Sequence, residues 1–487
     1  KRPFFLEGAD IFQSPSQVFY SRTIIDPDVA VKLTGKIGKT SFGILAASDN
    51  APGNYDENER NNPLIRPRIN EFLDKNATFA VLRLKQDFGK ENNIGFFATY
   101  RGFPEQNNLV SAIDGRFKFS PKLTSSVNLI GTHSRRCFFD PSFDPQTDPA
   151  GAARNGELCG GGTYGDITVS GNPFQRYRTG IGVGYYWNLD FSEKNRGWFI
   201  EAGGRSKDYR ADAGFTRRTN TNFLFFMYRL STESKPKSKI IQANWRQFSG
   251  INYDWKGRLQ EFNLGTNVGL NLQRNTSVRI ETGIFNERLF EEEFGLKRTP
   301  TRAGAFVGSP TRGAWQHYIS GNMETTPLKR VSFGLFLGHI YNAFDFDFGS
   351  PQQDPGPGRQ FDAELWGEIK PIDPLRISLS YRKSRLVRLD DNRRAFDADL
   401  VTLRSTYQFT RFLFTRLRVD YDSNGQEYNG QALIGWTPSP GTAFYAGYND
   451  NFTYSGFNPY TRQPEPGFAR DSRTFFIRMT YLFRKSF

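Results

Sequence analysis

Residues 261–272 read Glu-Phe-Asn-Leu-Gly-Thr-Asn-Val-Gly-Leu-Asn-Leu and alternate between polar and apolar side chains. One face of this stretch is apolar apart from Thr266, and the other face carries only polar residues and glycine. A period of two is that of a β-strand with one apolar and one polar face. The apolar positions are Phe262, Leu264, Val268, Leu270 and Leu272.

The same alternation recurs at 181–189, 331–338 and 376–382. Strands of soluble sheets average about five or six residues, whereas a tilted strand needs about ten residues to cross a bilayer. Many of the periodic segments reach that length, so we predict an all-β fold, a transmembrane antiparallel up-and-down β-barrel. A large soluble β protein such as a propeller is the alternative, but the chain has no blade-length repeat. Aromatic residues near segment ends are typical of interfacial girdles: Trp187, Phe191, Tyr341, Tyr407, Phe409 and Trp436.

Composition excludes several other classes of protein. Of 487 residues, 37% are hydrophobic and 15% aromatic, and the formal net charge is +14. A disordered chain lacks such aromatics, and the longest apolar run, 223–228, is far shorter than the ~20 residues of a membrane helix. Three His and two Cys leave little for a metal or nucleophile site, so we expect no cofactor and no enzyme. The basic residues are spread along the strands rather than clustered, so we expect no nucleic-acid partner.

The connections between periodic segments predict the topology. Short polar turns, such as those near residues 38, 274 and 371–374, alternate mostly with longer loops, such as 49–75, 134–172 and 342–359. Outer-membrane barrels have short periplasmic turns and longer external loops. We therefore predict about 22 strands, the first at 17–24 and the last at 473–484, with both termini in the periplasm. The predicted domains are an N-terminal segment, 1–16, and a barrel, 17–487, in the cell outer membrane of a Gram-negative bacterium as a multi-pass protein.

The end of the chain supports this assignment. Phe475, Ile477, Met479, Tyr481 and Phe483 share one face, and Phe487 ends the chain at the same parity. This pattern resembles the terminal signature by which bacterial outer-membrane barrels are recognised for assembly. We therefore expect Phe487 to be the natural C-terminus and the assembly signal.

The N-terminal region resembles a known family. Residues 1–12 read Lys-Arg-Pro-Phe-Phe-Leu-Glu-Gly-Ala-Asp-Ile-Phe, followed by Val-Phe-Tyr-Ser-Arg at 18–22 and Asp-Val-Ala-Val-Lys-Leu-Thr-Gly-Lys at 28–36. They resemble the opening of an uncharacterised bacterial outer-membrane β-barrel family. Its members usually carry a periplasmic domain similar to carbohydrate-binding module family nine before the barrel. The resemblance implies no activity and no catalytic residues, and because this sequence lacks that domain, we expect it to be part of a longer chain.

The polar face of the predicted strands is strongly charged. A basic wall favours anionic or sugar-like solutes, whereas the alternative is a set of cross-strand ion pairs that stiffen the wall. Part of the net charge also suits lipid and lipopolysaccharide phosphate at the outer rim. The predicted pore-lining residues are Lys32, Arg83, Lys85, Arg101, Arg116, Arg205, Arg229, Arg246, Arg279, Arg376, Arg382, Arg404, Arg416, Arg418 and Arg478.

A barrel of about 22 strands is wide, and barrels of that size usually hold a plug. Residues 1–16 are too few for a folded plug domain. The lumen is therefore open, filled by inward loops, or occupied by a missing N-terminal domain or a periplasmic or surface protein partner. Phe4, Phe5, Leu6 and Phe12 are apolar enough to anchor the N-terminal segment against the inner wall, and we favour a filled lumen over a fully open pore.

Cys137 and Cys159 lie in one predicted external loop. Because the compartment is oxidising, we expect a disulfide between them, which would stabilise the protein by roughly 3 kcal/mol in the chain-entropy model.

Two functional hypotheses follow from the sequence. The first is a transport or export channel, linked to saccharides through the missing periplasmic domain. The second is a non-conducting membrane anchor or scaffold for other envelope or surface proteins.

Overall fold

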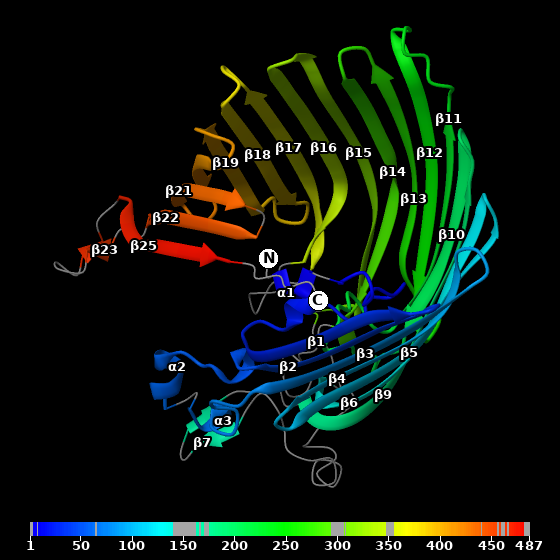
Figure 1. Ribbon diagram of the computed structural model, residues 1–487, viewed down its shortest axis with the longest axis vertical. Coiled ribbons are helices and arrows are strands. Elements are labelled where there is room, and N and C mark those ends of the chain that lie inside the picture. Colours follow the sequence, from blue (N-terminus) through cyan, green and yellow to red (C-terminus); the bar gives the residue numbers. More distant parts are fainter. Residues whose placement is uncertain are drawn as a thin grey trace. The chain divides into compact units, whose positions relative to one another are not determined.

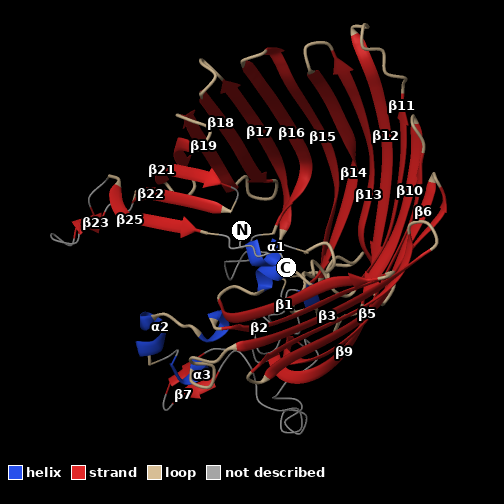
Figure 2. Ribbon diagram, in the orientation of Figure 1, coloured by secondary structure: helices blue, strands red, loops and turns tan. Residues whose placement is uncertain are grey.

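The computed structural model describes residues 3–6, 8–63, 66–139, 162–164, 167–169, 175–293, 306, 308–346, 355–439, 441–454, 457–458, 463–464 and 467–481. Long strands dominate these residues, and helical turns are few and short (Figure 2). The helical elements are α1 (Pro3–Leu6), η1 (Ser21–Thr23), η2 (Ala51–Gly53), α2 (Glu57–Asn61), α3 (Arg66–Ile69) and η3 (Glu291–Glu293). None of the helices in these ranges is long and apolar enough to span a membrane.

The chain divides into two compact units. The first comprises residues 1–229, 248–263 and 286–313. Its first eight long strands pair antiparallel in chain order, each with the next, and they lie side by side in Figure 1. They are β1 (Pro27–Ile37), β2 (Thr40–Asp49), β3 (Ala77–Phe88), β4 (Asn92–Phe103), β5 (Gln106–Ser120), β6 (Leu123–Phe139), β9 (Gln175–Ser192) and β10 (Arg196–Arg205).

The second unit comprises residues 230–247, 264–285 and 314–487. Its strands from β15 onward also pair antiparallel in chain order. They are β15 (Thr311–Leu328), β16 (Val331–Asp345), β17 (Gly356–Ile369), β18 (Leu375–Arg388), β19 (Arg394–Gln408), β20 (Leu413–Asp422), β21 (Glu427–Ser439), β22 (Thr442–Thr453) and β25 (Ala469–Thr480).

Five strands contribute residues to both units: β15, through residues 311–313, and the strands β11 (Thr221–Ser231), β12 (Ile240–Tyr253), β13 (Leu259–Leu272) and β14 (Thr276–Phe290). All 21 long strands belong to one antiparallel sheet. Two small pairs of strands stand apart from it, β7 (Gly162–Tyr164) with β8 (Ile167–Val169), and β23 (Phe457–Asn458) with β24 (Gln463–Pro464). The predicted class, a transmembrane antiparallel up-and-down β-barrel, is confirmed.

The strand register separates an apolar face from a polar one. In the second unit Leu379 lies opposite Leu403, which lies opposite Val419, and all three side chains are exposed. Exposed apolar side chains on consecutive strands form the surface that faces lipid in a membrane barrel. The other face of the same strands carries Ser380, Thr402 and Asp420, which share the opposite parity.

Aromatic pairs lie at two levels of this apolar face. Tyr421 contacts Tyr428 with ring centroids 4.6 Å apart, and Trp436 contacts Phe444 at 6.1 Å. Tyr428 and Trp436 are eight residues apart on β21, which at ~3.3 Å per residue is about 26 Å along the strand. The spacing fits two interfacial girdles on either side of the hydrocarbon layer.

The prediction of a strand at 17–24 is wrong. These residues are extended chain and the 3-10 turn η1, and the first long strand begins at Pro27. The described residues therefore contain 21 long strands instead of 22. Pro27 pairs with Asp49 beside the long connection 50–76, so β1 begins at the long-loop end of the sheet.

The apolar residues of 17–24 fail to form a strand because they pack against the wall instead of pairing with it. Val18 and Ile24 are buried in a hydrophobic cluster with residues of β2 to β6, among them Leu45, Phe79 and Val110. In this part of the sheet both faces are apolar, since Ile44 is exposed on the opposite face from Leu45. The core of the first unit thus lies on the face that the alternation predicted to be polar.

Candidate functional site

Two segments cover the inner face of the first unit. They are residues 8–26, which precede β1, and residues 206–220, which connect β10 to β11; together we call them the cover. The backbone N–H of Tyr20 donates to the carbonyl of Ala213 at 2.8 Å, and that of Phe215 donates to Gln17 at 3.0 Å. These bonds join the two segments into one layer.

Apolar side chains hold the cover against the wall. Phe12, Val18 and Ala213 are buried in the cluster with the strands, and Phe5 packs against its edge. The expectation that the N-terminal segment is anchored by its aromatic residues is met by Phe5 and Phe12. Phe4 is 38% exposed, although the Lys32 ammonium lies 4.9 Å from its ring centroid, and the side chain of Leu6 lies outside the described residues.

Asn108 fixes the 206–220 segment through its main chain. The fully buried amide donates to the carbonyl of Arg210 at 3.0 Å and accepts from the N–H of Asp212 at 2.9 Å. The same amide nitrogen donates to the Ser134 hydroxyl at 2.8 Å. One side chain on β5 therefore satisfies two backbone groups of the cover, which leaves few buried polar groups unpaired at this contact.

Tyr209 packs where the wall has no side chain. A Cβ atom at Gly182 of β9 would lie 2.3 Å from the Tyr209 Cα, so only glycine permits this approach. The Arg205 guanidinium lies 5.7 Å from the Tyr209 ring centroid. Burial raises the pKa of the Tyr209 hydroxyl, against the smaller effect of Arg205.

Four arginines surround a pocket at the edge of the cover. Arg136 of β6 and Arg210, Arg217 and Arg218 of the cover line a space of about 420 Å³. Arg136 pairs with Asp212 at 2.9 Å, and Arg218 pairs with Glu261 at 2.7 Å and Glu293 at 2.9 Å. We call this space the arginine pocket.

A second pocket lies within the second unit, on the polar face of β14 to β18. It measures about 400 Å³ and combines two aromatic side chains with charged ones. Its residues are Arg279, Glu281, Ser320, Asn322, Met323, Glu324, Leu335, Phe336, Glu364, Trp366 and Arg382. We call it the aromatic pocket.

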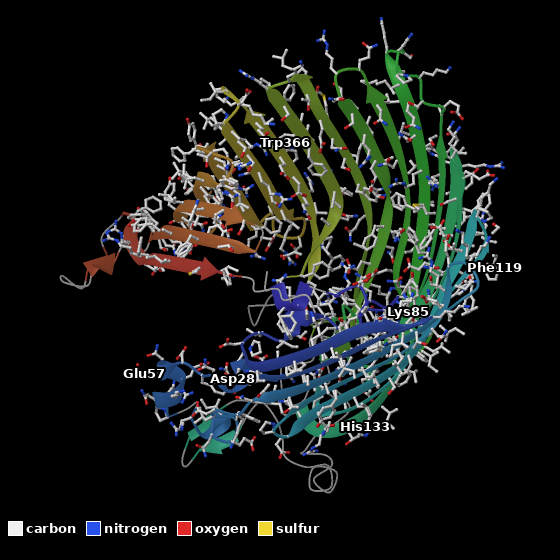
Figure 3. The ribbon with its side chains drawn as sticks, in the orientation of Figure 1. Asp28, Glu57, Lys85, Phe119, His133 and Trp366 are labelled. Carbon is white, nitrogen blue, oxygen red and sulfur yellow. The ribbon has the colours of Figure 1, made fainter. Side chains whose placement is uncertain are left out.

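Trp366, labelled in Figure 3, is one of the two aromatic residues that line the aromatic pocket. It lies opposite Gly334 in the register, and a Cβ atom at Gly334 would be 2.4 Å from the indole Nε1. The indole therefore covers the backbone of the neighbouring strand, as aromatic residues do when they shield a glycine in a sheet. Beside it Arg382 faces Glu364 at 3.5 Å, and Glu281 accepts from Asn267 at 3.2 Å.

The register and contacts place all the predicted pore-lining residues on the face opposite the lipid-facing side chains. In the first unit Arg83 is buried and pairs with Asp114 through two hydrogen bonds, and Arg101 lies 5.7 Å from the Phe79 ring centroid. Arg229 donates to the Ser192 hydroxyl at 3.2 Å. The others in this unit are Lys32, Lys85, Arg116 and Arg205.

In the second unit the predicted residues fall into two groups. Arg279 and Arg382 come together in the aromatic pocket. Arg404 lies directly opposite Arg418, with Arg416 one position further along the same face, although like charges opposite each other destabilise a sheet. Arg418 is offset by Asp420 at 2.6 Å, and Arg376 by Glu368 at 3.5 Å. The remaining two residues are Arg246 and Arg478. Each follows or precedes an exposed, lipid-facing residue, Trp245 and Met479 respectively, so each arginine points to the other face.

Sequence reasoning found Arg279 and Arg382 of the aromatic pocket but missed its aromatic residues and the arginines of the cover. Trp366 and Phe336 occupy polar-face positions of their strands, where an aromatic residue interrupts the alternation, and that interruption was a usable signal. Arg210, Arg217 and Arg218 lie in a connection, where period-two reasoning assigns no face. Cys159, the side chain of Cys137 and Phe487 lie outside the described residues, so the disulfide and the assembly signal stay predictions. In the part of the chain that the structure describes, no group of three or more His, Cys, Asp or Glu side chains could hold a metal ion.

Comparison with known proteins shows the fold. No family model and no curated protein sequence matches the chain. Among solved structures, the copper transporter OprC matches with a TM-score of 0.50 and 11% identity, over 91% of this chain and 75% of that one. The siderophore receptor PirA from Pseudomonas aeruginosa has a TM-score of 0.48 and 10% identity, over 94% and 78% of the two chains. The ferric-catecholate import receptor Fiu from E. coli K12 has a TM-score of 0.45 and 9% identity, over 93% and 79%.

The fold and the lipid-facing surface define the chain as an outer-membrane β-barrel protein. Strands cross membranes as barrels, because every backbone group must be paired within the bilayer. The exposed apolar face and its two aromatic levels supply the surface that such a protein presents to lipid. The chain is therefore a multi-pass protein of the Gram-negative outer membrane.

Proposed function

We propose that this protein is an outer-membrane transport channel for a saccharide solute. The observation that supports the proposal is the aromatic pocket, in which Trp366 and Phe336 stand among charged side chains on the polar face. A sugar ring presents an apolar C–H face, which stacks on an aromatic ring, and a rim of hydroxyls, which bind carboxylates, amides and guanidinium groups. Binding sites commonly combine apolar walls with a few placed polar groups in this way.

The partners of the polar side chains distinguish a binding surface from a stiffened wall. Ion pairs such as that of Arg376 with Glu368 link neighbouring strands and so stiffen the wall. By contrast, the side chains of Arg279, Asn322 and Glu324 make no hydrogen bond or ion pair within the described ranges, while all three line the pocket. Unused donors and acceptors beside an aromatic ring are what a polyhydroxylated solute requires.

The experiment is a planar-bilayer recording of the purified protein with a panel of neutral oligosaccharides. We expect ion conductance that the best oligosaccharide of the panel blocks. Trp366→Ala should keep the conductance and weaken the block about tenfold, because an aromatic contact contributes about 0.5–1.5 kcal/mol. Trp436→Ala is the matched control, since Trp436 belongs to the lipid-facing girdle and its loss should leave the block unchanged.

The scaffold hypothesis predicts the opposite results. A protein that conducts no ions, even after deletion of residues 1–16, and that co-purifies with stable subunits from native membranes would refute the channel. A channel whose block by sugar is equally affected by both tryptophan variants would refute the role of the aromatic pocket. Membership of the family with the carbohydrate-binding periplasmic domain is a separate proposal, and it is tested by asking whether the gene encodes such a domain upstream of the barrel.

A further inference from the structure

We propose that the arginine pocket binds an oxyanion, the phosphate or carboxylate group of a soluble solute. The site lies wholly in the first unit and shares no residue with the aromatic pocket. The inference therefore goes beyond the proposed function and is tested without reference to conductance.

Two of the arginines are held in place by carboxylates that are themselves fixed. Glu261 also accepts from the Asn252 amide at 2.8 Å, and Glu293 accepts from the Gln260 amide at 2.9 Å. Arg218, between these two carboxylates, uses one nitrogen for each. A guanidinium group has five N–H donors in a rigid plane, so these pairs orient the group and leave donors over. Arg136 is oriented in the same way by Asp212, whose own backbone Asn108 holds.

Arg217 supplies a charge that the fold itself does not use. Its side chain is exposed and makes no ion pair or hydrogen bond with any described residue, yet it lines the same pocket as Arg136 and Arg218. The hydroxyl of Thr216, also in the lining, is buried and without a hydrogen-bond partner among the described residues. Three carboxylates pair with Arg136 and Arg218, whereas Arg217 has no carboxylate partner among the described residues. The pocket thus offers excess positive charge and unused donors, which is the chemistry that binds an oxyanion, often bidentately.

Its position decides between a soluble and a lipid source of that group. Leu129 of β6 is exposed toward lipid, as is Tyr185, its partner on β9. Arg136 belongs to the other face of β6, which points away from the lipid. Phosphates of lipid headgroups lie around the apolar face, so they do not reach the pocket. We therefore assign the oxyanion to a solute on the water-filled side.

The experiment measures binding of inorganic phosphate to the full chain in detergent by titration calorimetry, with acetate as a competitor. We expect saturable binding that Arg217→Gln weakens at least about tenfold, since hydrogen bonds to charged groups are the strong ones. Arg22→Gln is the matched control, because Arg22 belongs to the cover but not to the pocket lining and, among the described residues, donates only to the Tyr20 hydroxyl at 3.3 Å. That variant should change the affinity less than about twofold.

A second arm repeats the titration in vesicles with and without an anionic phospholipid. Equal affinity for phosphate in both supports a soluble source, whereas competition by the lipid would overturn it. The absence of phosphate binding by the unaltered protein, or equal weakening by Arg217→Gln and Arg22→Gln, would overturn the site itself. Both arginines are exposed, and a heat-modifiability gel verifies that each variant is folded.

Discussion

Arg83 and Asp114 show what the cover does to a single residue. The two side chains form a bidentate pair and are 1% and 4% exposed. Phe12 of the cover packs over Gly43, which lies directly opposite Arg83 in the register. The Arg83 guanidinium also lies 5.3 Å from the Phe97 ring centroid. Period-two alternation correctly gave the face of Arg83 but not its burial, since burial depends on a segment more than fifty residues earlier in the chain.

Replacing Arg83 with Ala should destabilise the protein by about 3–5 kcal/mol, because the change leaves the Asp114 carboxylate buried without a partner. The measurement is equilibrium unfolding in denaturant after reconstitution. Lys85→Ala is the control, since Lys85 follows on the same face of β3 and is only partly buried; we expect a change within about 0.5 kcal/mol. Equal effects of the two variants would contradict the role assigned to the buried pair.

At the scale of elements, the sequence predicted nearly every long strand but not the cover. A strand with one lipid-facing and one polar face reveals itself by its period. The segment 17–24 has a similar apolar content, but its apolar side chains meet the wall and its backbone bonds reach Ala213. Sequence periodicity reports which residues are buried and not what they are buried against, so the two cases look alike before folding.

The docking of the cover predicts a glycine dependence. Gly182→Val should displace the 206–220 segment, because its Cβ would meet the Tyr209 backbone. In a background with Cys137 and Cys159 replaced by Ser, a cysteine introduced by Ala213→Cys reports the change, since Ala213 is fully buried. We expect slow maleimide labelling at this position in the parent and fast labelling once Gly182 is changed.

Gly131→Val is the matched control for that experiment. Gly131 lies on the neighbouring strand β6 and a Cβ atom there meets nothing within 4 Å. Labelling should stay slow in this variant. Fast labelling in both variants would show that any added valine loosens the sheet, and slow labelling in both would show that the cover does not depend on Gly182.

At the scale of the whole molecule, the membrane determines where a charge is tolerated. Leu403→Arg, in the middle of the lipid-facing surface, should cost about 2–4 kcal/mol of folding free energy in lipid vesicles, and Ile369→Arg, at the end of β17, only about 0–1 kcal/mol. Both side chains are similarly exposed, so depth alone separates them. Equal costs would contradict the assignment of the two aromatic levels as interfaces.

The lipid-facing surface is predictable from the sequence because every strand must present apolar side chains to the lipid at every second position. The pockets obey no such rule: Trp366 depends on a glycine of another strand, and the arginine pocket on carboxylates from η3 and β13. These contacts join residues that lie far apart in the chain. Without a register, nothing in the sequence says which of them meet.

Asn108 recognises two peptide groups of the cover and none of its side chains. Peptide groups are the same whichever residue carries them, so this attachment survives most substitutions between 207 and 218. Arg217 can therefore be exchanged for another side chain without undoing the fold that presents it. In evolutionary terms, the backbone of this segment holds it in place while its exposed side chains are free to vary. The ligand preference of the pocket can therefore change one residue at a time.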